Sequence, residues 1–142
     1  MKAMFDINVV LDIVGNREPF REASEAAYFS ALEHGEKPCL SAHAYPTLYY
    51  LLGAAATRRQ RSAAMDWIFD SFSPASVTAV ELTAARGYRM PDFEDAIVAA
   101  AANSSACDLI VTRNANHFAG GPVKAVSPSE FTRLFKSTHS TK

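Results

Sequence analysis

Three aspartates have positions suited to holding a cation. Asp6 lies inside the apolar run 2–14 (KAMFDINVVLDIV), at the end of a predicted strand, and Asp92 and Asp95 lie three apart where a predicted helix begins. A buried carboxylate costs several kcal/mol unless a charge or a hydrogen bond meets it. Mg²⁺ accepts one or two carboxylates plus water, and such an ion activates water and stabilises a phosphate oxygen. These positions suggest a metal site.

A purely structural interpretation competes for two of these acids. Asp92 is well placed as a helix N-cap, and Asp95 would favour the positive end of the helix dipole. Asp12 follows Asp6 by six residues, which is about 240° around a helix. We therefore expect Asp12 to face elsewhere, as a surface or helix carboxylate and not as a ligand.

Short apolar runs typical of strands alternate with segments of helical period. We predict strands within 2–5, 38–42, 73–77, 108–112 and 123–126, and helices within 8–14, 18–36, 45–56, 58–72, 78–88, 92–105 and 127–135. Asn8 is the expected cap of the first helix. Alternation of this kind predicts an α/β protein with a parallel sheet covered on both faces.

Polar residues collect where two of these strands end. In parallel α/β sheets, function gathers beyond the carboxyl ends of the strands. Asp6 ends the first strand, and Thr112, Arg113 and Asn114 end the run DLIVT. We expect them at one rim of the sheet. His117, in the loop that follows, is expected to be solvated.

Composition limits the protein class. The chain has 142 residues, 49% hydrophobic and 20% charged, with a net charge of -1, which predicts one domain over 1–136 and a polar tail over 137–142. Charges interrupt every apolar run, so we expect no membrane association and no secretory signal. Cys39 and Cys107 are expected to be reduced thiols in a cytoplasmic protein.

Near-neutral charge means that nucleic-acid binding needs a local basic patch. The densest run is TRRQR, with Arg58, Arg59 and Arg61. It is either a solvated helix start or a contact to an RNA backbone.

Three segments together resemble a known family. The quoted runs MFDINVVLDIV, DFEDAIVAAAA and LIVTRNANHF resemble motifs of the PIN domain, in particular of the VapC-like toxins of bacterial type II toxin–antitoxin systems. The resemblance covers about 2–135. It implies a three-layer α/β/α sandwich around about five parallel strands, and an endoribonuclease that uses Mg²⁺ or Mn²⁺. It also implies RNA as substrate, an antitoxin partner and a homodimer.

Only some of the acids that are usual in the family are present at the matching positions of this chain. Asp6 and Asp95 match two of them, and the resemblance makes both metal ligands and catalytic residues. Thr47 falls where the family usually has a Glu, and Asn114 stands where a fourth acid is usual, so Asn114 is a catalytic candidate and Asp92 a third ligand candidate. This departure affects metal affinity and rate more than fold.

Thr112, Arg113 and the function of the protein each have more than one interpretation. Thr112 either completes the hydrogen bonding of the sheet or positions a phosphate or carboxylate, and Arg113 either binds RNA phosphate or pairs with Asp6 or Asp95. Against the ribonuclease stand a PIN-fold binding module with too few acids to cut, and a small-molecule-binding α/β domain. No Gly-rich loop follows the first strand, which argues against a nucleotide-binding Rossmann-type site.

Overall fold

The computed structural model describes residues 1–140 and contains five parallel strands in the order β3-β2-β1-β4-β5. The strands are β1 (Ala3–Phe5), β2 (Cys39–Ser41), β3 (Ser73–Ala75), β4 (Leu109–Val111) and β5 (Lys124–Val126). All five lie within predicted strand segments. Because β1 is central, the residue that follows it lies in the middle of the rim.

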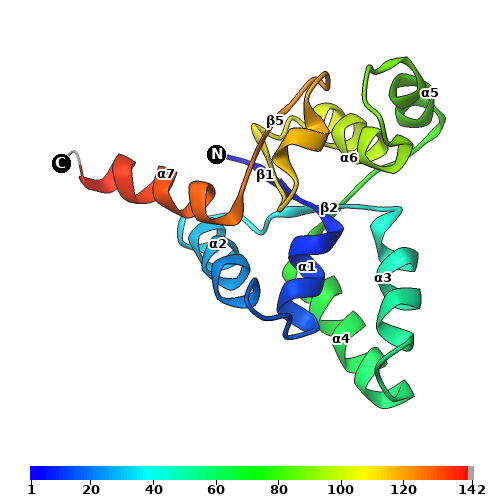
Figure 1. Cartoon of the computed structure of the whole chain (residues 1–142), viewed down its shortest axis with the longest axis vertical. Coiled ribbons are helices and arrows are strands. Elements are labelled where there is room, and N and C mark those ends of the chain that lie inside the picture. The colour runs from blue at the N-terminus through cyan, green and yellow to red at the C-terminus, as the bar shows by residue number, and fades with distance from the viewer. Residues whose placement is uncertain (141–142) are drawn as a thin grey trace.

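Helices cover both faces of this sheet, which confirms the predicted α/β/α sandwich (Figure 1). They are α1 (Ile7–Val14), α2 (Arg21–Glu33), α3 (Ala44–Gly53), α4 (Arg58–Ser71), α5 (Ala79–Gly87), α6 (Phe93–Ser104), the 3-10 turn η1 (Ala115–Phe118) and α7 (Pro128–Ser140). The predicted polar tail begins inside α7, and its last two residues, 141–142, lie outside the described part of the chain. No helix among residues 1–140 is long and apolar enough to span a membrane.

Strand alternation divides the core between the two faces. Phe5 and Val111 belong to the larger core, beneath α1, α2, α4 and α7, whereas Met4 and Ile110 belong to the core beneath α6. Successive strand residues point to opposite faces, so each short buried strand supplies both cores. The three central strands are buried at every residue, so the polar groups next to them lie mainly where these strands end.

Capping residues set several helix starts as the sequence predicts. Thr78 and Glu81 form the predicted capping box at α5, and the Ser127 hydroxyl accepts from the Glu130 backbone N–H at α7. The predicted cap of α1 is wrong. Asp6 is the N-cap, and Asn8 lies inside the first turn of the helix. The strand therefore runs directly into the helix through the acid itself.

The helices α3 and α4 form an arm that projects away from the sheet (Figure 1). Its outer side exposes several large apolar side chains: Tyr49, Tyr50, Leu51 and Phe69. The turn between the two helices is the tip of the arm, and α4 begins there at Arg58.

Candidate functional site

Asp6 joins the central strand to α1 and is almost fully buried, with 7% of its surface exposed. One carboxylate oxygen accepts from the backbone N–H of Ile7 at 2.9 Å, and the other accepts from the Thr112 hydroxyl at 2.8 Å. Burial raises the pKa of Asp6 above its usual value, although these two hydrogen bonds act in the opposite direction. No basic side chain of residues 1–136 forms an ion pair with it. Asp6 is a buried acid held by neutral donors alone.

The end of β4 supplies the neutral partner. Thr112 is fully buried, and its hydroxyl accepts from the Asn114 backbone N–H at 3.1 Å while donating to Asp6. Both roles weighed for Thr112 are observed, because its hydroxyl positions the Asp6 carboxylate and its backbone N–H donates to the Val126 carbonyl at 3.0 Å, which continues the sheet pairing. Asn114 is exposed and follows this contact directly, so its amide lies at the rim as predicted.

The N-terminus of α6 brings in the second acid. The Asp92 carboxylate accepts from the Asp95 backbone N–H at 3.0 Å, so the cap interpretation of Asp92 is confirmed. Asp95 has its pKa raised to about 6, first by burial and then by the negative charges of Asp6 and Asp92. Residues 89 positions apart in the chain thus come close enough to repel. His117 reaches this pair, with Nδ1 3.9 Å from Asp95.

These oxygen donors suit a hard divalent cation that needs only one or two protein carboxylates. Two neighbouring carboxylates whose negative charges repel are stabilised by a cation between them, and Mg²⁺ is commonly held by one or two carboxylates with water completing its shell. Among the side chains of residues 1–136, which the structure describes, no three acidic, His or Cys groups are arranged to hold an ion together. Thr47, at the place of the usual Glu, instead donates its hydroxyl to the His43 carbonyl. The donors therefore fit a two-carboxylate site and not a full acidic cage.

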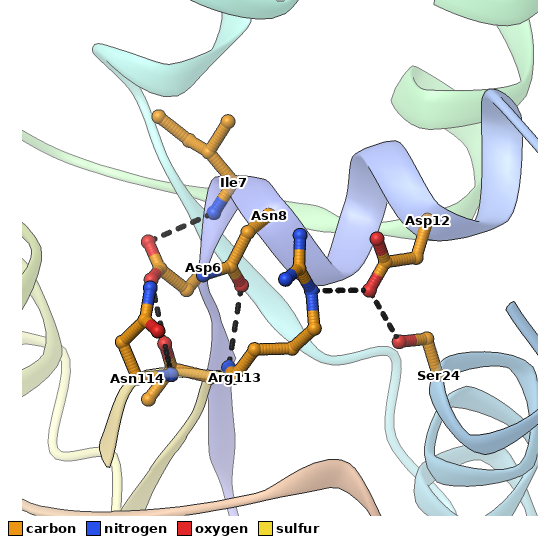
Figure 2. A network of polar contacts seen from close by, with 8 residues as sticks. Asp6, Ile7, Asn8, Asp12, Ser24, Arg113 and Asn114 are labelled. Atoms are coloured by element: carbon orange, nitrogen blue, oxygen red, sulfur yellow. Dashed lines mark hydrogen bonds and ion pairs between the residues drawn. The ribbon is translucent and has the colours of Figure 1, made fainter. Parts of the chain in front are cut away.

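Asp12 lies inside α1, so the expectation of a helix carboxylate is confirmed and that of a surface carboxylate is wrong. It is fully buried, not on the surface, and accepts from Arg113 Nε at 2.9 Å and from the Ser24 hydroxyl at 3.0 Å (Figure 2). The Arg113 guanidinium also lies over the Phe20 ring, at 4.0 Å from its centroid. The alternative in which Arg113 pairs with Asp6 or Asp95 is wrong, because Arg113 forms its ion pair with Asp12. Nucleic-acid contact by Arg113 stays a prediction that competes with this assignment.

The basic run lies away from the acids. Arg58, Arg59 and Arg61 begin α4 at the tip of the arm, about 15 Å from the sheet rim if α3 is taken at its full length of 10 residues. Arg61 is placed over the Tyr49 ring, with its guanidinium carbon 3.9 Å from the ring centroid. The structure therefore does not gather these arginines into the site.

Two polar residues at the site, His43 and Glu94, were not predicted from the sequence. His43 follows β2, contacts the Ser41 hydroxyl through Nδ1, and has a buried Nε2 without a partner in the described residues. Burial lowers the pKa of His43, while Glu94 opposes that shift, and Glu94 also raises the pKa of Asp6. The position of His43 just beyond a predicted strand was the available signal.

Fold and rim together define an α/β protein with a carboxylate pair at the carboxyl end of its central strand. The PIN domain sequence profile matches residues 2–116. The chain belongs to the PIN domain family, as its three motifs indicated. A comparison with curated proteins finds no match.

Solved structures give the same fold. The chain is similar to VapBC2 from Rickettsia felis, solved bound to a DNA fragment from its promoter (14% identity, TM-score 0.67, 89% of this chain and 98% of that one). It is also similar to a toxin–antitoxin complex from Klebsiella pneumoniae (20%, 0.66, 89% and 98%) and to VapBC-1 from nontypeable Haemophilus influenzae (13%, 0.67, 91% and 99%). At these identities the likeness establishes the fold.

Proposed function

We propose that the protein is a metal-dependent endoribonuclease of the VapC type, which hydrolyses RNA phosphodiester bonds. The observation that carries the proposal is the approach of Asp95 to Asp6, whose negative charge helps to raise the pKa of Asp95. Membership of the PIN family supports it. Two neighbouring acids that repel each other at the rim destabilise the fold, and a cation bound between them would relieve that repulsion.

Each residue has a distinct task in this proposal. Asp6 and Asp95 hold the ion, and Asp92 and Asn114 assist through water or directly. When bound, Mg²⁺ or Mn²⁺ supplies a water of lowered pKa and positive charge for a phosphate oxygen. Thr112 donates to one Asp6 oxygen and so fixes the direction of that carboxylate. The buried position of Asp6 limits competition from bulk water.

The test combines metal binding with cleavage. Calorimetric titration with Mn²⁺ and cleavage of a fluorogenic single-stranded RNA would be measured for the parent, Asp6→Asn and Asp95→Asn. We expect both variants to lose Mn²⁺ affinity and cleavage together, while circular dichroism stays that of the parent. Asp108→Asn is a matched control, because Asp108 accepts from the Lys2 backbone N–H at 2.8 Å before β4 begins, at the opposite end of that strand. Cleavage that persists in Asp6→Asn contradicts the proposed site.

A binding module is the second candidate function. It is favoured by Thr47 and Asn114 standing where acids are usual, and by the lack of a three-residue metal group among the side chains of residues 1–136. In that case the parent binds RNA in EDTA and cuts none at any Mn²⁺ concentration. Cleavage that is lost in EDTA and restored by Mn²⁺ rules this candidate out.

The proposed partners are RNA, an antitoxin protein and a second copy of the chain. The antitoxin proposal rests on the similar structures, which were solved as toxin–antitoxin complexes. The homodimer proposal rests on the exposed apolar side chains of α3 and α4, which a second copy would cover. Sedimentation across a wide concentration range tests the dimer, and a monomer throughout contradicts it. Buried free thiols at Cys39 and Cys107 favour a cytoplasmic setting.

A further inference from the structure

The segment 112–114, at the end of β4, is tied to both ends of α1. Near the start of the helix, Thr112 donates to Asp6, and the Arg113 backbone N–H points to the Asn8 side-chain oxygen at 3.4 Å. Near the end of the helix, the Arg113 side chain reaches Asp12 (Figure 2). A single strand end is thus held at two points that lie six residues, or about 9 Å, apart along the chain of Asp6 and α1.

The ion pair between Asp12 and Arg113 restricts the orientation of the Arg113 side chain. Asp12 has no exposed surface and Arg113 retains 25% exposure of its side chain, so the pair is largely shielded from solvent. The planar guanidinium is fixed on one edge by the Asp12 carboxylate and on its face by the Phe20 ring. These two contacts leave the side chain of Arg113, and therefore its backbone, little freedom.

Stability alone explains this pair poorly. Apolar residues of similar volume often replace buried ion pairs without loss of stability. One oxygen of Asp12, Oδ1, is buried with no partner among the described residues, which is a cost that an arrangement selected only for stability would avoid. The ion pair fixes the orientation of Arg113 relative to α1, which apolar packing would not do.

We propose that Asp12 and Arg113 are positioning residues: their ion pair holds the segment 112–114 so that the Thr112 hydroxyl fixes the Asp6 carboxylate and Asn114 faces the same rim. Arg113 then acts through the segment and does not contact RNA. This inference rests on the proposed metal-dependent function, because orientation of Asp6 matters most when that carboxylate holds an ion. Outer residues that orient ligands commonly change metal affinity 10–100-fold when mutated.

The experiment separates positioning from stability with a matched pair of variants. Asp12→Asn leaves Arg113 without its counter-ion, whereas the double variant Asp12→Leu/Arg113→Met replaces the pair with apolar side chains and recovers stability. Mn²⁺ affinity, the kcat and KM for RNA cleavage, and the salt dependence of RNA binding would be measured for each. Arg21→Gln is the control, because Arg21 pairs with Glu25 at 2.7 Å on the exposed side of α2.

We expect both Asp12 variants to bind Mn²⁺ at least about tenfold more weakly and to lose kcat, with KM and the salt slope unchanged. The control keeps all parent values. A stable double variant that binds Mn²⁺ like the parent overturns the inference and leaves the pair structural. A raised KM with a flatter salt slope and unchanged Mn²⁺ affinity also overturns it, because that pattern belongs to a phosphate contact.

Amide hydrogen exchange in EDTA tests the same geometry without metal. The Asn114 amide, which donates to Thr112, should exchange faster in both Asp12 variants than in the parent and in Arg21→Gln. Unchanged exchange contradicts the positioning role even if metal binding weakens. If the parent itself binds no Mn²⁺, the proposed function fails, and exchange alone then decides whether the pair orders this segment.

Discussion

Helix α1 carries two buried carboxylates in opposite electrostatic situations. Asp12 meets the guanidinium of Arg113 and the hydroxyl of Ser24, so its charge is compensated within the protein. Asp6 meets a hydroxyl and one backbone N–H, and the neighbouring acid Asp95 adds negative charge. The same helix therefore contains an acid that the fold neutralises and an acid that it does not.

The difference distinguishes an acid that orders the fold from an acid that is available to bind a ligand. A neutralised acid fixes two segments relative to each other, and its removal should damage the fold. An acid left with excess negative charge destabilises the fold, and natural proteins retain such groups where they bind or react. Mutating Asp12 should therefore lower the free energy of unfolding, whereas mutating Asp6 should not.

The largest effect is expected for Asp12→Asn. Breaking a buried ion pair by removing one partner leaves an uncompensated charge, and since Arg113 is a quarter exposed we expect a loss of about 3 kcal/mol, the lower end of the range for such pairs. Asp6→Asn should leave the free energy of unfolding unchanged or higher, because the amide no longer carries a buried charge. Urea unfolding of both variants in EDTA checks this. An equal loss in both would remove the distinction between the two acids.

A smaller effect depends on pH. The pKa of folded Asp95 is about 6 against an ordinary value of 3.8, so between these values the folded state binds more protons than the unfolded state. Parent stability should then fall as pH rises through this window, with the raised pKa of Asp6 acting in the same direction. Above it, Asp95→Asn should be more stable than the parent by on the order of 2 kcal/mol, after allowance for its partial exposure.

Urea unfolding at pH 4 to 8 in EDTA measures this difference. The advantage of Asp95→Asn should shrink toward zero near the bottom of the window, where Asp95 is protonated in the folded parent as well. An advantage that is independent of pH would mean that the variant acts by packing and not by removing a charge.

A third effect tests Asn114 at the same rim. Asn114→Asp adds a negative charge near Asp6 and Asp95, which should cost about 1 kcal/mol in EDTA. With millimolar Mn²⁺ the added carboxylate should tighten binding, so the variant should gain more thermal stability than the parent does. Melting temperatures of both proteins with EDTA and with Mn²⁺ measure the two gains. Equal gains would show that residue 114 does not face the ion.

The sequence predicted Asp6, Asp95 and the rim because those features are local. A carboxylate at the end of an apolar run and a carboxylate in the first turn of a helix are visible in short windows, and parallel strands bring their carboxyl ends to one edge. The buried strands likewise follow from short, continuous apolar runs, because a strand covered on both faces is apolar at every position. The fold family and the positions of these two acids follow from these short segments and their order along the chain.

Asp12 shows where local inference fails. Its angle around α1 does place it away from Asp6, but that other side faces α2 and not solvent. Four consecutive residues of the helix are buried: Val9, Val10, Leu11 and Asp12. A helix that is buried nearly all round has no free side for a charge, so this acid needed a partner. The partner, Arg113, is 101 residues away, and no local pattern identifies such a pairing.

The smallest effect is expected at the tip of the α3–α4 arm, where charge is neither buried nor close to the acids. Arg58→Gln and Arg59→Gln together should change the free energy of unfolding by less than about 0.5 kcal/mol, as exposed substitutions usually do. If the arm binds RNA, each arginine that neutralises a phosphate adds about 0.7 to the salt slope for a single strand, so removing both should flatten it by up to about 1.4. Arg61→Gln serves for comparison, because Arg61 is placed over Tyr49 and its removal should also weaken the packing of α3 against α4. RNA binding measured by fluorescence anisotropy over a range of salt concentrations decides the matter. A slope that stays the same in all three substitutions removes the arm from the RNA path and confines nucleic-acid binding to the rim where Asp6 and Asp95 meet.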